Sequence, residues 1–224
     1  MTTVFQPHEL LVVFDVDNVI IPGQTQKCFL GKLLRAGDVS LFSFSVVCSW
    51  FLLYKAGITV NTQRIRRYAY RQLAGKRSAN LRQLCADLFQ SELRPKIFPA
   101  AMKKIASYRD RGATVILMSS SLREIVERIQ EYIGVETCIA TNLEVRNGSY
   151  TGEIQGGVPY GEGKVHKLQE FIAENGPYRK IIAYCDHDSD LPLLEYVHEP
   201  IIVNPNKRMR RLAEERRWRV EQHT

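Results

Sequence analysis

Residues 10–17 read LLVVFDVD, a short apolar run that ends in two aspartates one residue apart. A run of this kind is typical of a strand that is buried on both faces of a parallel sheet. Similar runs follow at 113–118 (ATVILM), 181–185 (IIAYC) and 200–203 (PIIV), with helical patterns at 100–111, 122–132, 164–174 and 191–196. This alternation of strand and helix predicts an α/β fold with a doubly wound, Rossmann-like parallel sheet.

Two stretches interrupt the alternation. Residues 143–154 (LEVRNGSYTGEI) carry Asn147 and Gly148 between two β-prone arms, which predicts a β-hairpin. Residues 22–98 contain no obvious parallel strand and consist mostly of helix-forming residues. We therefore expect residues 22–98 to form an α-helical cap domain inserted into an α/β core, which comprises residues 1–21 and 99–224.

The positive charge of the chain is concentrated in this expected cap. The whole chain has 31 Lys and Arg against 24 Asp and Glu, a net charge of +7. Residues 22–98 hold thirteen of the bases and three of the acids, so the cap carries +10 and the rest of the chain −3. A basic cap on a weakly acidic core indicates an anionic substrate. No nucleic-acid recognition motif accompanies the charge, so we expect no nucleic-acid partner.

The cysteines and the first residues indicate a cytoplasmic protein. The five cysteines are an odd number, widely scattered and without a C-x-x-C pair, which is typical of a reduced protein. Residues 1–8 are polar and lack the basic and apolar regions of a secretory signal. The alternative is a peripheral location at the inner face of the membrane, which one apolar segment in the cap suggests.

That segment, residues 41–54 (LFSFSVVCSWFLLY), has no charge over fourteen residues. It is shorter than the roughly 18–20 residues needed to span a bilayer as a helix. A buried cap helix is the favoured interpretation. In the alternative, the helix and its basic rim of Lys55, Arg64, Arg67 and Arg71 dock on an anionic membrane or admit a lipid phosphate. The arginines share one helical face, so they could instead bind a second anionic group of a soluble substrate; a solvated surface is the ordinary structural explanation.

Polar side chains lie at the carboxyl ends of the predicted strands. In a doubly wound sheet, ligands bind at these ends. The side chains are Asp15 and Asp17 after the first strand, Ser119, Ser120 and Ser121 after the second, Asp186, Asp188 and Asp190 after the third, and Lys164 at the head of a helix. Each has an ordinary structural explanation when taken alone, such as strand termination or helix capping. Converging carboxylates need a cation, and oxygen ligands suit Mg²⁺ better than zinc.

These residues resemble the motif set of the haloacid dehalogenase superfamily of phosphohydrolases, over almost the whole chain. FDVDNVI (14–20) matches the first motif, VILMSSS (115–121) the second, Lys164 in YGEGKVHKL the third, and AYCDHDSDLPLLEYVHEPIIVNPN (183–206) the fourth. The insertion between the first two motifs is similar to the helical cap of the phosphoserine-phosphatase-like branch. The resemblance therefore implies a phosphomonoester hydrolase that acts on a small phosphorylated substrate.

The resemblance also implies a role for each motif residue. Asp15 would be the nucleophile that forms an aspartyl-phosphate, and Asp17 would protonate the leaving group and later activate water. Ser119 would hydrogen-bond a phosphoryl oxygen, aided by the backbone N–H groups of Ser120 and Ser121. Lys164 would neutralise developing charge.

The metal ligands follow from the same resemblance. Mg²⁺ would be held by Asp15, by the backbone carbonyl of Asp17 and by Asp186. Asp190 would order the waters of the metal or the ammonium of Lys164.

One departure bears on the substrate. Gln24 stands nine residues after Asp15, where phosphoserine phosphatases carry a Glu that pairs with the ammonium of the substrate. A neutral amide binds an ammonium less well than a carboxylate does, which argues against phosphoserine. Gln24, Arg64 and Arg67 are the cap residues that we expect to contact substrate. A binding protein that has lost its chemistry is the alternative of another class, disfavoured because every motif residue is present.

Overall fold

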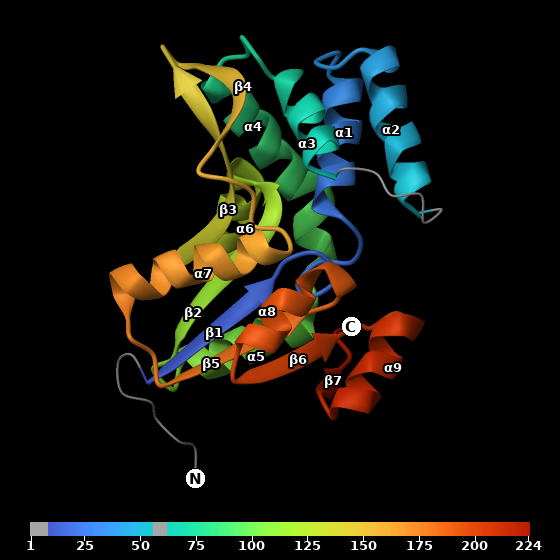
Figure 1. Cartoon of the computed structure of the whole chain (residues 1–224). Coiled ribbons are helices and arrows are strands. Elements are labelled where there is room, and N and C mark those ends of the chain that lie inside the picture. Colours follow the sequence, from blue (N-terminus) through green and yellow to red (C-terminus); the bar gives the residue numbers. More distant parts are fainter. Residues whose placement is uncertain (1–8, 56–61) are drawn as a thin grey trace.

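A seven-stranded sheet runs through the centre of the computed structural model, which describes residues 9–55 and 62–224 (Figure 1). Its strands are β1 (Leu10–Asp15), β2 (Thr114–Leu122), β3 (Thr137–Arg146), β4 (Ser149–Gln155), β5 (Lys180–Cys185), β6 (Glu199–Val203) and β7 (Arg219–Glu221). They lie in the order β4-β3-β2-β1-β5-β6-β7. All neighbours are parallel except β3 and β4, which form an antiparallel hairpin. The predicted doubly wound α/β fold with a hairpin is confirmed.

Between β1 and β2 the described residues form four α-helices, then a short π-helix (Phe89–Leu93) and a 3₁₀ turn (Arg94–Lys96), before the helices of the core begin. These four are α1 (Thr25–Arg35), α2 (Leu41–Lys55), α3 (Thr62–Arg71) and α4 (Ser78–Leu88), which we call the cap helices. The core helices are α5 (Pro99–Arg109), α6 (Arg123–Ile133), α7 (Glu162–Asn175), α8 (Leu191–Tyr196) and α9 (Lys207–Arg216). Figure 1 shows α1, α2 and α3 side by side beyond the carboxyl ends of the central strands.

The apolar run of β1 is buried on both faces of the sheet. Leu10, Val12 and Phe14 join the apolar cluster that includes residues of α5, α6 and the cap helices. Leu11 and Val13 join the cluster formed with residues of α7, α8 and α9. β1 also pairs with β2 on one side and β5 on the other, and each of its residues is buried. An unbroken apolar sequence is what such a position requires.

The hairpin fastens the cap helices to the sheet. Its turn is formed by Asn147 and Gly148, both with positive φ, as the sequence predicts. On the other side of β4, the backbone N–H of Tyr150 donates to the carbonyl of Lys76 (2.9 Å) and its carbonyl accepts from the N–H of Gly75 (2.8 Å). Gly152 packs so closely on α3 that an added Cβ would lie 3.0 Å from the Cα of Arg71.

Helix α2 is less buried than expected. Leu41 and Phe42, at its first turn, are 72% and 75% exposed. Among the residues of α2 whose side chains are described, Phe44, Val47 and Cys48 turn inward and are half-buried. Because the helix is apolar on nearly every side, its sequence did not indicate which face would be covered. No helix in the described part of the chain is long and apolar enough to span a membrane.

The two edges of the sheet differ from the expectation. The sequence predicts β3 only from residue 143, whereas the strand begins at residue 137 and first pairs in parallel with β2. The strand β7 was not predicted, because no apolar run follows the one at residues 200–203. It comes after α9, which ends at residue 216 and buries Met209 and Ala213 against the sheet.

Candidate functional site

A buried lysine lies between two carboxylates at the carboxyl ends of the strands. Lys164, in the first turn of α7, is 2% exposed. Its Nζ is 3.0 Å from Oδ2 of Asp15, which ends β1, and 2.9 Å from Oδ1 of Asp190, in the helical turn before α8. Asp186, the first residue after β5, completes the group: one oxygen each of Asp15, Asp186 and Asp190 lie within 4.8 Å of one another.

The electrostatics of this group follow from burial and from mutual charge. Burial raises the pKa of Asp15 well above its ordinary value; Lys164 opposes this shift, and the neighbouring aspartates add to it. Burial also raises the pKa of Asp186, to about 6. Burial alone would lower the pKa of Lys164, but Asp15 and Asp190 hold it well above the ordinary value, so the ammonium stays charged.

The donor set fits a divalent cation. Three carboxylates share one ammonium, so the site has unbalanced negative charge. Oδ2 of Asp190 is buried and has no hydrogen-bond partner among the described residues. Carboxylate and carbonyl oxygens are the ligands that Mg²⁺ takes in proteins. Buried carboxylates of like sign lose their repulsion when such an ion neutralises them.

The loop after β1 is held by its own polar side chains. Oδ1 of Asp17 accepts a hydrogen bond from the N–H of Thr25 (2.8 Å), at the start of α1. Burial raises the pKa of Asp17, which favours its protonated form. Asn18 adopts a left-handed conformation with φ of 55°, and its Nδ2 donates to Oδ2 of Asp186 (2.8 Å). No role was predicted for Asn18, although Asn is among the few residues that adopt this conformation easily.

The C-terminal residues support the same loop from the other side. His223 is 3% exposed, and its Nδ1 donates to the carbonyl of Val19 (2.7 Å). Nδ2 of Asn204, just after β6, donates to the carbonyl of Asn18 (2.9 Å), and its Oδ1 accepts from the N–H of His223 (2.9 Å). Asn204 falls within the fourth-motif segment (183–206) and His223 outside every motif, and neither was assigned a role, because their partners are backbone groups about 200 residues earlier in the chain.

The three serines of the second motif take different positions. Ser119 is buried, and its Oγ accepts from the N–H of Ser121 (3.1 Å). That N–H, expected to bind phosphate, is therefore already engaged. Ser121 contacts Thr25 through a hydroxyl pair 2.6 Å apart. Only Ser120 of the three lines the cavity described next.

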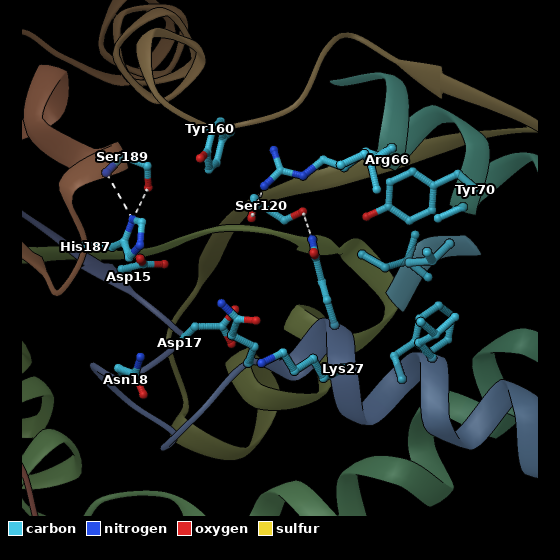
Figure 2. A pocket seen from close by; sticks show the side chains of 18 of the residues that line it. Asp15, Asp17, Asn18, Lys27, Arg66, Tyr70, Ser120, Tyr160, His187 and Ser189 are labelled. Carbon is cyan, nitrogen blue, oxygen red and sulfur yellow. Dashed lines mark hydrogen bonds between the residues drawn. The ribbon is translucent and has the colours of Figure 1, made fainter. Parts of the chain in front are cut away.

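A cavity of about 630 Å³ extends from the carboxylates into the cap helices (Figure 2). Asp15, Asp17, Lys164, Asp186 and Asp190 lie at its polar end. The opposite end is lined by apolar residues of α1, α2 and α3. The predicted catalytic and metal-binding residues are thus brought together at one end of a single cavity.

Among the expected cap residues, only Gln24 lines this cavity. Arg64 and Arg67 are exposed and do not line it, so the expectation for them is not met. The arginine that does is Arg66, whose guanidinium lies 4.0 Å from the ring centroid of Tyr160 and whose Nη2 is 3.4 Å from Oγ of Ser120 (Figure 2).

The packing of α3 explains this difference. The helix turns Ile65, Ala69 and Tyr70 towards the cavity, and Arg66 belongs to the same face, one turn before Tyr70. Arg71 faces outward and forms an ion pair with Glu153 of β4, 3.1 Å apart. The inward face of α3 is indicated by its apolar residues and not by the spacing of its arginines.

Residues 12–195 match the sequence profile of the haloacid dehalogenase-like hydrolases. A Mycobacterium tuberculosis protein named as a probable phosphatase is 30% identical over 210 residues, covering 92% of this chain and 73% of the relative. The histidinol-phosphatase of Neisseria meningitidis is 26% identical over 215 residues, covering 94% of this chain and 97% of the relative.

Solved structures share the fold. A protein of unknown function from Bordetella pertussis superposes with a TM-score of 0.87 at 25% identity, over 95% of this chain and 97% of the other. A phosphoserine phosphatase solved as an analogue of its phospho-aspartyl intermediate gives a TM-score of 0.65 at 18% identity, over 91% and 90% of the two chains. The phosphoserine-phosphatase-like fold expected from the motifs is confirmed.

Proposed function

The chain belongs to the haloacid dehalogenase-like hydrolases, and from this premise we propose that it is a Mg²⁺-dependent phosphomonoester hydrolase that works through an aspartyl-phosphate. The observation that carries the proposal is the position of Asp15. Its carboxylate lies at the end of a cavity, with Oδ2 on the ammonium of Lys164 (3.0 Å) and Oδ1 on the N–H of Val16 (2.7 Å). Both contacts fix the direction of the carboxylate, as a nucleophile requires.

The reaction proceeds in two displacements at phosphorus. In the first, an oxygen of Asp15 forms a bond to phosphorus, the ester P–O bond breaks, and Asp17 gives its proton to the leaving alkoxide. In the second, Asp17 accepts a proton from water, the water oxygen bonds to phosphorus, and the bond to Asp15 breaks to release phosphate. Burial raises the pKa of Asp17, which keeps the proton available for the first step.

The remaining residues bind and orient. Asp15, Asp186 and the backbone carbonyl of Asp17 would hold Mg²⁺, with Asn18 fixing Asp186 by its hydrogen bond of 2.8 Å and Asp190 aligning Lys164. When bound, the ion supplies positive charge that offsets the repulsion between a carboxylate and a phosphate.

The phosphoryl oxygens have two further donors nearby. They are Ser120 and Arg66, which lie at the cavity wall on the side of Tyr160. Ser119, which was expected to donate to phosphate, is buried behind this wall and holds the N–H of Ser121. A guanidinium suits a phosphoryl group because it offers several donors in one plane.

The substrate is proposed to be a small phosphorylated molecule other than phosphoserine. Gln24 lines the cavity where a carboxylate would be needed to bind an ammonium group. The variant in which the cap also docks on an anionic membrane has one supporting observation, the exposed Leu41 and Phe42 of α2.

The test is release of phosphate from an aryl monophosphate in the presence of Mg²⁺. Asp15→Asn should abolish turnover, because an amide is too weak a nucleophile. Asp188→Asn is the matched control: Asp188 lies in the same turn as Asp190 but pairs with Arg208 (2.6 Å) and does not line the cavity. Unchanged turnover by Asp15→Asn would refute the mechanism, and no phosphate release from a broad panel of esters would favour the binding protein.

A further inference from the structure

The cavity continues well beyond the phosphate site, into the space between three cap helices. Its far wall is formed by Phe29, Leu30 and Leu33 of α1, Phe44, Val47 and Cys48 of α2, and Ile65 and Ala69 of α3. We call this part the apolar arm. The whole cavity, about 630 Å³, lies within the roughly 300–1,000 Å³ of pockets that enclose a small molecule.

From this shape we propose that the substrate is a monophosphate ester of an amphiphilic alcohol, whose apolar chain lies as a single molecule in the apolar arm. The inference deepens the proposed hydrolase function and rests on it. A substrate bound in this way places its phosphate at Asp15 and Lys164 and its hydrocarbon among α1, α2 and α3.

The distribution of charge along the cavity supports an apolar chain. All carboxylates among the described lining residues belong to the strand ends, around Asp15 and Asp186. An ammonium group in the cap part would have no counter-charge there. Sugar or base groups would lose hydrogen bonds to water on entering the apolar arm and gain few in return, which disfavours them strongly.

Polar side chains form a belt between the phosphate site and the apolar arm. Gln24, Gln26, Lys27 and Arg66 line this part of the cavity. Figure 2 shows Arg66 reaching in from α3 towards Ser120 and Tyr160, while Lys27 extends from α1 near Asp17. Such a belt suits the ester or hydroxyl oxygens that join a phosphate to a hydrocarbon chain, because it supplies donors at that junction.

The two apolar regions of α2 are distinct. Phe44, Val47 and Cys48 are spaced at i, i+3 and i+4, which places them on one face, and this face lines the cavity. Leu41 and Phe42 lie outside it and are exposed. Binding of a chain inside the cap and adsorption of the cap to a surface therefore depend on different residues, which an experiment can separate.

The expected signature is a dependence of kcat/KM on chain length. Burying one methylene contributes enough free energy to raise kcat/KM about fourfold. We would measure ethyl, butyl, hexyl and octyl monophosphate, each below its micelle concentration, so that only single molecules are present. The rise should continue until the arm is full and then stop.

Two matched variants locate the effect. Val47→Phe places a larger side chain in the apolar arm, so the rise should stop at a shorter chain. Ser45→Phe adds the same side chain to the same helix at an exposed position that does not line the cavity, and should leave the profile unchanged. Replacing both Leu41 and Phe42 with Ser should also leave it unchanged; loss of the profile in that variant would assign it to surface adsorption instead.

A binding measurement separates the failure of this inference from failure of the proposed function. Alkyl phosphonates of the same lengths cannot be hydrolysed, and their affinity for the wild-type protein with Mg²⁺ can be measured by calorimetry. Affinity that rises with length and responds to Val47→Phe supports the apolar arm even without turnover. Turnover that depends on Asp15, together with a flat profile for both esters and phosphonates, overturns the apolar arm and leaves the hydrolase intact.

Discussion

Replacing Lys164 with Met removes the one ammonium that lies between two buried carboxylates. Met keeps a linear side chain of similar length, so the change removes charge with little loss of packing. In the wild type, Nζ is 3.0 Å from Asp15 and 2.9 Å from Asp190, and Lys164 is 2% exposed. Breaking a buried ion pair on one side costs about 3–5 kcal/mol, because the remaining charge has no compensation.

For a domain of this size, 1 kcal/mol corresponds to roughly 2–4 °C in melting temperature, so we expect a fall of about 6–20 °C. The assay is urea and thermal unfolding without metal, in EDTA, where no cation replaces the lysine. Adding Asp190→Asn to the Lys164→Met protein should recover part of the loss, because it removes one of the two uncompensated charges. The double variant should regain part of the lost stability but none of the phosphatase activity.

The control is Lys167→Met, one turn further along α7. Lys167 pairs with Glu170 at 2.7 Å, but both side chains are partly exposed to solvent, so the change should leave the stability close to that of the wild type. If Lys164→Met is within about 1 kcal/mol of this control, the buried ion pairs do not stabilise the fold and the reasoning is refuted.

Three further predictions follow from the site and the fold. Mg²⁺ at a hundred times its dissociation constant should stabilise the wild type by about 2.7 kcal/mol and the Asp186→Asn variant far less. If scanning calorimetry shows that Mg²⁺ raises the melting temperature of both proteins equally, Asp186 is not a metal ligand. Iodoacetamide should modify at most the two half-buried cysteines, Cys28 and Cys48, of the native protein, and an octyl phosphonate should protect only Cys48, which lines the apolar arm; mass spectrometry of the labelled peptides decides both. Asn204→Ala should lower the free energy of unfolding by about 1–3 kcal/mol and reduce turnover, because the loop after β1 loses its support. A variant whose unfolding curve and turnover rate equal those of the wild type would contradict this prediction.

The central strands and the polar end of the site were predictable because they obey local rules. A strand buried on both faces, such as β1, must be apolar throughout, and parallel strands place the residues that follow them at the same edge. Asp15, Lys164 and Asp190 could therefore be brought together without coordinates. The beginning of β3 and the whole of β7 lie towards the edges of the sheet, where burial is partial and the pattern is weaker.

The cap was predictable only in outline. Its helical character and its charge were evident, but the inward face of α3 depends on how that helix packs, so the spacing of Arg64 and Arg67 did not identify Arg66. An all-round apolar helix such as α2 has no preferred face in its sequence, so the cavity beneath it was not foreseen. The support from Asn204 and His223 is made to backbone carbonyls, which carry no sequence signal.

The contact between His223 and Val19 also has a consequence for the order of events during biosynthesis. The two residues are 204 positions apart, so the loop that carries Asp17 and Asn18 leaves the ribosome long before its partner is made. Domains begin to fold from the N-terminus as the chain emerges, and β1 can pair with β2 at an early stage. The loop, however, gains its last hydrogen bonds only after residue 223 has been translated. We therefore expect a nascent chain that ends before β7 to form the central strands of the sheet but not an active site. Phosphatase activity should begin only after residue 223 has been translated.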